Sequence, residues 1–181
     1  MTGTSTDNEL RTGRDWRAAF SALRRLLSDP GDTVQVFHIM RALNAGNAKA
    51  GYERLLRTDG GGRIAYRRTE LAALFSDPDY VARFPAGSLG AAYGAFLQQT
   101  GYSAKGLADV SEMKETGQEG EHPYMWFARR TRDVHDVWHV LTGYRADDPL
   151  GEASLVAFSY AQTGGLGWAL IALGGMYRGW R

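Results

Sequence analysis

Two histidines and one aspartate near the end of the chain have the residue types and spacing of a metal site. His135 and His139 are four residues apart, so on a helix they lie one turn apart on the same face, and both imidazoles can reach one ion. Asp136 lies about 100° around that helix, where it can reach the ion from the side or accept a hydrogen bond from an imidazole N–H. The spacing therefore predicts a shared ligand for the two imidazoles.

A fourth candidate ligand, Glu152, comes from a second predicted helix. Gly143 is a typical helix stop, residues 144–149 form a polar turn rich in aspartate, and a helix is expected to begin near Leu150. An antiparallel return would bring the Glu152 carboxylate back toward the histidines. The prediction is a metal site between two helices.

The donor set limits the choice of metal. Two imidazoles and two carboxylates suit zinc, iron, manganese or cobalt better than copper(I). The chain has no cysteine, which excludes thiolate ligands and disulfides. The competing interpretation is that the histidines only pack against a neighbouring helix and the carboxylates are solvated, because short motifs often match by chance.

Four further residues are candidates for binding a substrate. Arg129, Arg130 and Arg132 precede the histidines, and arginine suits bidentate recognition of a carboxylate or phosphate. The alternative is that they are solvated or paired with acids. Tyr93 lies in a predicted helix, 88–98, whose small residues would let a flat ligand or another helix approach closely.

The elements that position these residues are predicted to be helical, since no segment shows the period of two that is typical of strands. The chain is expected to be all-α, with a flexible segment 1–14 and a single-domain helical bundle over residues 15–181. Expected helices cover 15–28, 32–43, 48–56, 69–75 and 88–98, with a flexible turn at 59–62. The polar segment 101–120 is expected to be a helix fragment and loop that could cover the pocket, and the site helix is expected to run on from His122 and Pro123.

The segment 155–177 has no charged residue, and its length alone would permit a membrane span. Its polar residues and glycines favour two buried helices broken at Gly164 and Gly165. In the alternative, Trp168, Tyr177, Trp180 and Arg181 would lie at a bilayer interface.

Charge and the start of the chain bear on partners and location. The net charge is +1 with acids and bases interspersed, so a nucleic-acid partner is not expected. The first fourteen residues lack the apolar stretch of a secretory signal. We therefore expect a cytoplasmic bacterial protein that could contact the inner face of the membrane as a peripheral protein. The sequence leaves open whether the protein forms a homodimer.

The motif His135-Asp136-x-x-His139, followed by Gly151-Glu152, resembles the signature of the coenzyme Q biosynthesis protein 4 family. Upstream, Phe84-Pro85-x-Gly87-Ser88-Leu89-Gly90-x-x-Tyr93 resembles that family's Leu-Pro-x-Gly-x-Gly-x-x-Tyr segment. The resemblance covers the chain from about Trp16 onward. Two features depart from the family pattern: the gap between His139 and Glu152 is one residue longer, and the chain stops at Arg181 where relatives continue.

The resemblance implies a helical protein of ubiquinone biosynthesis that acts on a polyprenylated 4-hydroxybenzoate-type ring. The implied reaction is an oxidative decarboxylation, in which hydroxyl replaces the C1 carboxyl group. Carried over by position, His135, Asp136, His139 and Glu152 are metal ligands, and the implied partners include other ubiquinone-biosynthesis proteins. Two alternatives stay open: a non-catalytic scaffold or isoprenoid-lipid-binding protein that organises the biosynthetic complex, and a metal-dependent hydrolase.

Overall fold

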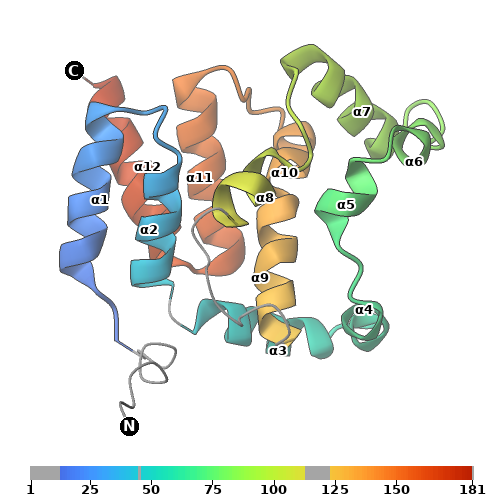
Figure 1. Cartoon of the computed structure of the whole chain (residues 1–181), viewed down its shortest axis with the longest axis horizontal. Helices are drawn as coiled ribbons and strands as arrows, with labels where there is room; N and C mark the ends of the chain where they lie inside the picture. The colour runs from blue at the N-terminus through green and yellow to red at the C-terminus, as the bar shows by residue number, and fades with distance from the viewer. Residues whose placement is uncertain (1–12, 45, 113–122, 181) are drawn as a thin grey trace, which may run out of the picture.

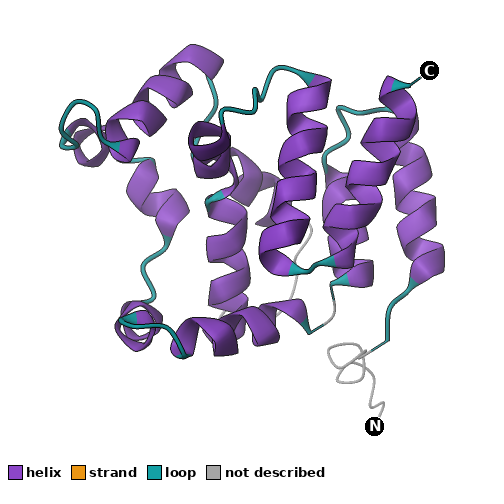
Figure 2. Ribbon diagram, turned by 180° about the vertical axis from the view of Figure 1, so that it is seen from behind, coloured by secondary structure: helices purple, strands orange, loops and turns teal. Residues whose placement is uncertain are grey.

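The computed structural model describes residues 13–44, 46–112 and 123–180. Within these residues the chain forms twelve helices and no strand (Figures 1 and 2), which confirms the predicted all-α class. In chain order the helices are α1 (Trp16–Ser28), α2 (Val34–Leu43), α3 (Asn47–Leu56), α4 (Gly61–Arg67), α5 (Leu71–Phe75), α6 (Pro78–Ala82), α7 (Leu89–Thr100), α8 (Gly106–Glu112), α9 (Pro123–Asp133), α10 (His135–Thr142), α11 (Pro149–Thr163) and α12 (Leu166–Gly179).

Four helices, α1, α2, α11 and α12, lie side by side in both ribbon views and pack on one another (Figures 1 and 2). A buried cluster of Ala19, Ala22, Ile39 and Leu43 joins α1 to α2, and leucines of α1 and α12 cover it. On the other side of the molecule α10 packs on α7, and α9 packs on α3 and α5. The α10–α11 pair thus lies where the two halves of the molecule meet.

Local signals in the sequence explain the ends of several helices. The side chains of Asp15 and Ser88 accept hydrogen bonds from the first turns of α1 and α7, which offsets the unpaired N–H groups there. Gly143 and Gly164 end α10 and α11 with positive φ angles of 73° and 69°, a conformation that costs glycine little. The predicted break at Gly164 and Gly165 is confirmed, and no helix among the described residues is long and apolar enough to cross a membrane.

The structure differs from the expected elements at three places. Gly61 begins α4 instead of belonging to a flexible turn, while Gly60 makes the turn with φ 72°. Pro78 begins α6, because proline is tolerated in a first helical turn, which Asp77 caps here. The predicted continuous site helix is interrupted at Val134, whose φ of −87° and ψ of 0° separate α9 from α10.

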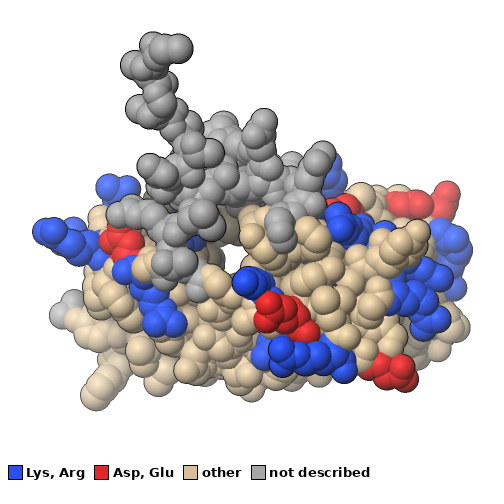
Figure 3. All heavy atoms as spheres, turned by 90° about the horizontal axis from the view of Figure 1, so that it is seen from below, with Lys and Arg blue, Asp and Glu red and all other residues tan. Residues whose placement is uncertain are grey.

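Some predictions concern residues that the structure does not describe. The polar segment 101–120 contains α8, as the expected helix fragment, but 113–120 lies outside the described residues. Residues 1–12 of the expected flexible segment 1–14 also lie outside the described residues. The same holds for His122 and Arg181. Acidic and basic side chains are interspersed on the face in Figure 3, as the charge pattern of the sequence indicates.

Candidate metal centre

The antiparallel return of α11 against α10 brings the Glu152 carboxylate to both predicted histidines. Its Oε1 lies 3.2 Å from Nε2 of His139, and its Oε2 lies 3.7 Å from Nε2 of His135. His135, Asp136 and His139 each offer one ligand atom, and these three atoms lie within 4.8 Å of one another. The four residues that the sequence singled out thus form one cluster.

The turn between the helices places Glu152. The Asp148 carboxylate accepts hydrogen bonds from the N–H groups of Leu150, at 3.3 Å, and Gly151, at 3.2 Å, and so caps α11 one turn before Glu152. Gly151 packs directly on the backbone of Arg145, where a Cβ atom would lie 2.8 Å from the Arg145 nitrogen. Only glycine lets the start of α11 approach the turn this closely.

His139 has the hydrogen-bonding pattern of a metal ligand. Its Nδ1 lies 2.8 Å from the backbone oxygen of Tyr144, and because a carbonyl only accepts, Nδ1 must carry the proton. In the neutral ring, Nε2 therefore has a free lone pair. This Nε2 is buried, and in the neutral ring it has no proton to donate to the Glu152 oxygen beside it. A backbone carbonyl that fixes the tautomer is a frequent partner of metal-bound histidine, so the residues fit a divalent ion.

Aromatic rings fix the orientation of both imidazoles. His135 stacks on Trp168 of α12, with ring centres 6.1 Å apart and planes at 10°. His139 stacks on Phe96 of α7, with ring centres 5.9 Å apart. The two imidazoles are nearly perpendicular, at 87°, so that they meet a common point from different directions. No pattern in the sequence indicates these roles of Trp168, Phe96 and the Tyr144 carbonyl, since only the packing of the helices shows them.

The charges of the cluster favour a cation. Burial opposes ionisation of Glu152, but the two imidazoles outweigh burial and lower the pKa of its carboxyl group to about 2. Burial raises the pKa of Asp136, and the histidines oppose that rise. Burial lowers the pKa of His139, but Glu152 and the Tyr144 carbonyl more than compensate, so the net pKa is raised. An ionised Glu152 thus faces two nitrogen donors, which is an arrangement that attracts a positive ion.

The three candidate arginines have different surroundings. Arg129 binds Glu70 through two contacts, Nη2 to Oε1 at 2.6 Å and Nε to Oε2 at 3.3 Å. Arg132 donates from Nε to Asp133 at 2.8 Å. The guanidinium carbon of Arg130 lies 5.7 Å from the centre of the Trp126 ring.

The fourth substrate candidate, Tyr93, is buried between Phe75 and Phe96. Burial raises the pKa of its hydroxyl, and the charge of Asp136 raises it further. Tyr93 therefore lies near the cluster, and Phe96 connects it to His139. Its role in binding a substrate stays a prediction.

A wide groove of about 3430 Å³ runs along the inner sides of α1, α2, α9 and α12 and reaches the cluster. His135 and Glu152 line it, together with the aromatic rings of Trp138 and Trp168. All three arginines also line this groove. The lining of the groove thus combines apolar side chains, basic side chains and residues of the candidate cluster.

Two kinds of comparison identify similar proteins. The family model described as coenzyme Q (ubiquinone) biosynthesis protein Coq4 matches residues 17–178. The chain is 30% identical over 128 residues to the mitochondrial ubiquinone biosynthesis protein COQ4 of Yarrowia lipolytica. The matched segment covers 67% of this chain and 45% of the relative. It is 31% identical over 112 residues to the mitochondrial ubiquinone biosynthesis protein coq4 of Pyrenophora tritici-repentis. This second matched segment covers 62% of this chain and 36% of the relative. The chain thus spans less than half of the length of these curated relatives.

Proposed function

The chain belongs to the coenzyme Q (ubiquinone) biosynthesis protein Coq4 family, and from this premise we propose that it is a metal-dependent oxidative decarboxylase of ubiquinone biosynthesis. Its substrate is a polyprenylated ring derived from 4-hydroxybenzoate, whose C1 carboxyl group is replaced by hydroxyl. The observation that carries the proposal is the buried Nε2 of His139, which faces Glu152 and, in the neutral ring, makes no hydrogen bond. Such an atom is costly to bury unless it binds an ion or, in the protonated ring, donates to Glu152.

The proposed reaction is a two-electron oxidation of the ring. The bond between C1 and the carboxyl carbon breaks, carbon dioxide leaves, and a C1–OH bond forms. With dioxygen as the oxidant, the simplest balanced form takes one ring acid, one dioxygen and one water, and gives one hydroxylated ring, one carbon dioxide and one hydrogen peroxide. The proposal therefore requires oxygen consumption together with release of carbon dioxide.

His135, Asp136, His139 and Glu152 would hold the ion. When bound, a divalent ion of the zinc, iron, manganese or cobalt group supplies Lewis acidity that stabilises negative charge on a ring oxygen. The chain's own residues keep the site in order, because Tyr144 fixes the His139 tautomer and the rings of Trp168 and Phe96 orient the imidazoles. Apolar side chains of the groove, such as Val36 and Ile171, would contact the isoprenoid tail.

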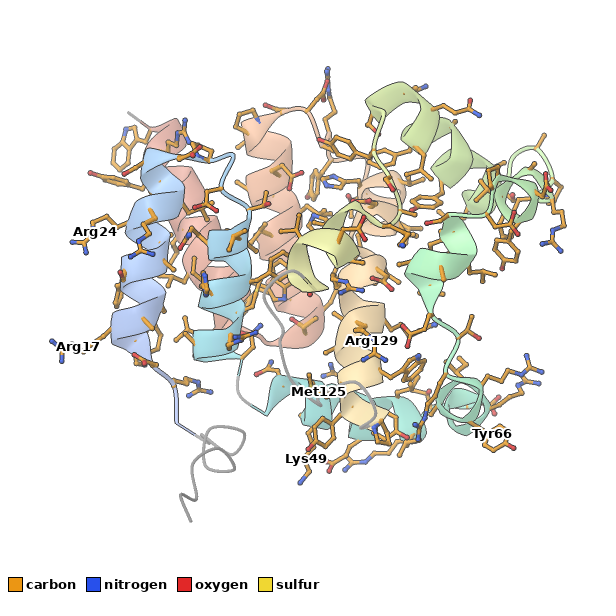
Figure 4. The ribbon with its side chains drawn as sticks, in the orientation of Figure 1. Arg17, Arg24, Lys49, Tyr66, Met125 and Arg129 are labelled. Atoms are coloured by element: carbon orange, nitrogen blue, oxygen red, sulfur yellow. The ribbon has the colours of Figure 1, made fainter. Side chains whose placement is uncertain are left out.

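An isoprenoid substrate resides in a membrane, and one face of the protein suits a peripheral membrane contact. Leu173, Met176 and Tyr177 of α12 and the C-cap residue Trp180 recur at helical spacing and are 52–92% exposed. Neither α1 nor α12 contains an acidic residue, and Arg17 and Arg24 point outward from α1 (Figure 4). Exposed apolar and basic side chains together favour an anionic bilayer surface. The proposal places this face on the inner side of a bacterial membrane.

The second candidate function is a non-catalytic one, in which the protein binds the isoprenoid lipid and organises other ubiquinone-biosynthesis proteins. The same exposed face favours it, because a scaffold also needs contact surfaces. Only turnover separates the two functions. A scaffold binds the lipid, with or without metal, and leaves the ring acid unchanged.

The test is turnover by the purified, metal-loaded protein with a prenylated 4-hydroxybenzoate in air. The enzyme proposal predicts carbon dioxide, oxygen consumption and a hydroxylated ring, all of which disappear in His139→Ala. Lipid binding without any of these products would contradict the enzyme proposal and support the scaffold. Carbon dioxide that forms without oxygen consumption and without a hydroxylated ring would contradict the oxidative reaction.

A further inference from the structure

The three arginines before the histidine motif differ in whether an acid already binds them. Glu70 contacts two nitrogens of Arg129, and Asp133 binds Arg132. Among the described residues, no acid lies within salt-bridge distance of Arg130, although that side chain is only partly exposed. Arg130 therefore has N–H donors that no carboxylate of the described part of the chain accepts.

The environment of Arg130 prepares it for an anion. The face of the Trp126 ring lies beside its guanidinium, and this aromatic contact orients the group without neutralising its charge. Burial lowers the pKa of Arg130, and the charge of Asp133 only partly opposes this effect. A cation that has lost part of its hydration gains more from an incoming anion than an exposed cation does.

Arg130 and the metal cluster share one groove. Arg130, His135 and Glu152 all line it, as does the aromatic ring of Trp168, which stacks on His135. Arg130 is on α9, and the interruption at Val134 leads directly from α9 to the histidines of α10. Arg130 thus lies in the last turn of α9 and lines the same groove as the cluster.

We propose that Arg130 binds the C1 carboxylate of the ring and thereby selects the acid over a ring that has no carboxyl group. The inference rests on the proposed function, since the substrate class comes from it. The planar fork of guanidinium N–H groups matches the two oxygens of a carboxylate. The ion pair exists only before decarboxylation, so the reaction removes a contact and favours release of the product.

The test compares binding of 3-geranyl-4-hydroxybenzoate with binding of 2-geranylphenol, which is the same molecule without the carboxyl group. Both affinities are measured on the metal-loaded full chain, for wild type, Arg130→Gln, Arg130→Lys and Arg129→Gln. Arg129→Gln is the matched control, because it removes the neighbouring arginine that Glu70 already binds. Thermal unfolding of each variant identifies any protein that has lost its fold.

We expect Arg130→Gln to weaken binding of the acid about 10- to 100-fold and binding of the phenol less than about threefold. Arg130→Lys keeps the charge but loses the fork, so its loss for the acid is smaller. Arg129→Gln leaves both affinities within about threefold. Three results would overturn the inference. Arg130→Gln could weaken binding of the acid and of the phenol equally, or weaken neither. Alternatively, Arg129→Gln could selectively lose binding of the acid.

Binding and turnover separate the two proposals. If Arg130→Gln selectively loses affinity for the acid but the wild-type protein does not convert the acid, the inference stands and the decarboxylase proposal fails. If wild type turns the acid over and Arg130→Gln binds it as well as wild type does, the decarboxylase proposal stands and the inference fails. Wild type that binds acid and phenol equally also overturns the inference.

Discussion

Nδ1 of His139 lies 2.8 Å from the backbone oxygen of Tyr144, a residue just beyond the end of the same helix. This hydrogen bond connects the proposed ligand to the turn that also places Glu152. The turn between α10 and α11 therefore controls both the tautomer of one ligand and the position of another. Changes in this turn are expected to affect metal binding even though none of the changed side chains contacts the ion.

Asp148→Ala should lower the free energy of unfolding by about 1 kcal/mol, because it removes the cap of α11. It should also weaken metal binding, since Glu152 lies in the first turn of that helix. Urea unfolding and metal titration measure the two effects. Asp147→Ala is the control, because its ion pair with Arg145 is exposed and solvent screens it, so that removing it should change stability little. Equal effects of the two variants would contradict the capping role.

Gly151→Ala should lower the free energy of unfolding by about 2 kcal/mol, because the added methyl group meets the backbone of Arg145. The strain moves α11 away from α10, so metal affinity should fall as well. Gly62→Ala is the matched control, since a methyl group there meets no atom within 4 Å, and alanine favours the helix. A Gly151→Ala protein that keeps wild-type stability and affinity would show that the turn tolerates a shift.

Asp133→Ala should lower the free energy of unfolding by about 3 kcal/mol. The buried carboxylate holds Arg132 and accepts from the N–H of Ala72 at 3.1 Å, so its removal leaves a largely buried cation and a buried donor without partners. Chemical unfolding measures the loss. Asp109→Ala, which removes an exposed pair with Lys105, should change stability by less than about 0.5 kcal/mol. A small loss for Asp133→Ala would mean that water replaces the carboxylate.

The double change Leu173→Ser and Trp180→Ser should reduce binding to anionic phospholipid vesicles about tenfold, because it removes two exposed apolar side chains from the proposed membrane face. Co-sedimentation with anionic and with neutral vesicles measures the partition. Tyr66→Ser is the control, since Tyr66 is 88% exposed and lies at the opposite end of the molecule (Figure 4). Unchanged vesicle binding together with loss of a dimer would instead assign the face to a second copy of the chain.

The sequence predicted local features well and the packing around the site poorly. The histidine spacing, the helix stop at Gly143 and the aspartate-rich turn are local, and together they predicted the approach of Glu152 to the histidines. The stacking of Trp168 on His135 depends on how α12 folds back over α10 and α11. No short-range pattern encodes that contact. The arginines show the same limit, because Glu70 lies 59 residues before Arg129.

The most direct test of the central claim is the metal content of the purified protein, measured by elemental analysis for wild type, His139→Ala and His38→Ala. His38 is the control, because it lines the groove on α2 but is not part of the His135–Asp136–His139 group. We expect close to one divalent ion per chain in wild type and in His38→Ala, and almost none in His139→Ala. A folded wild-type protein that holds no metal, and takes up none when metal is supplied, would contradict the proposed metal site.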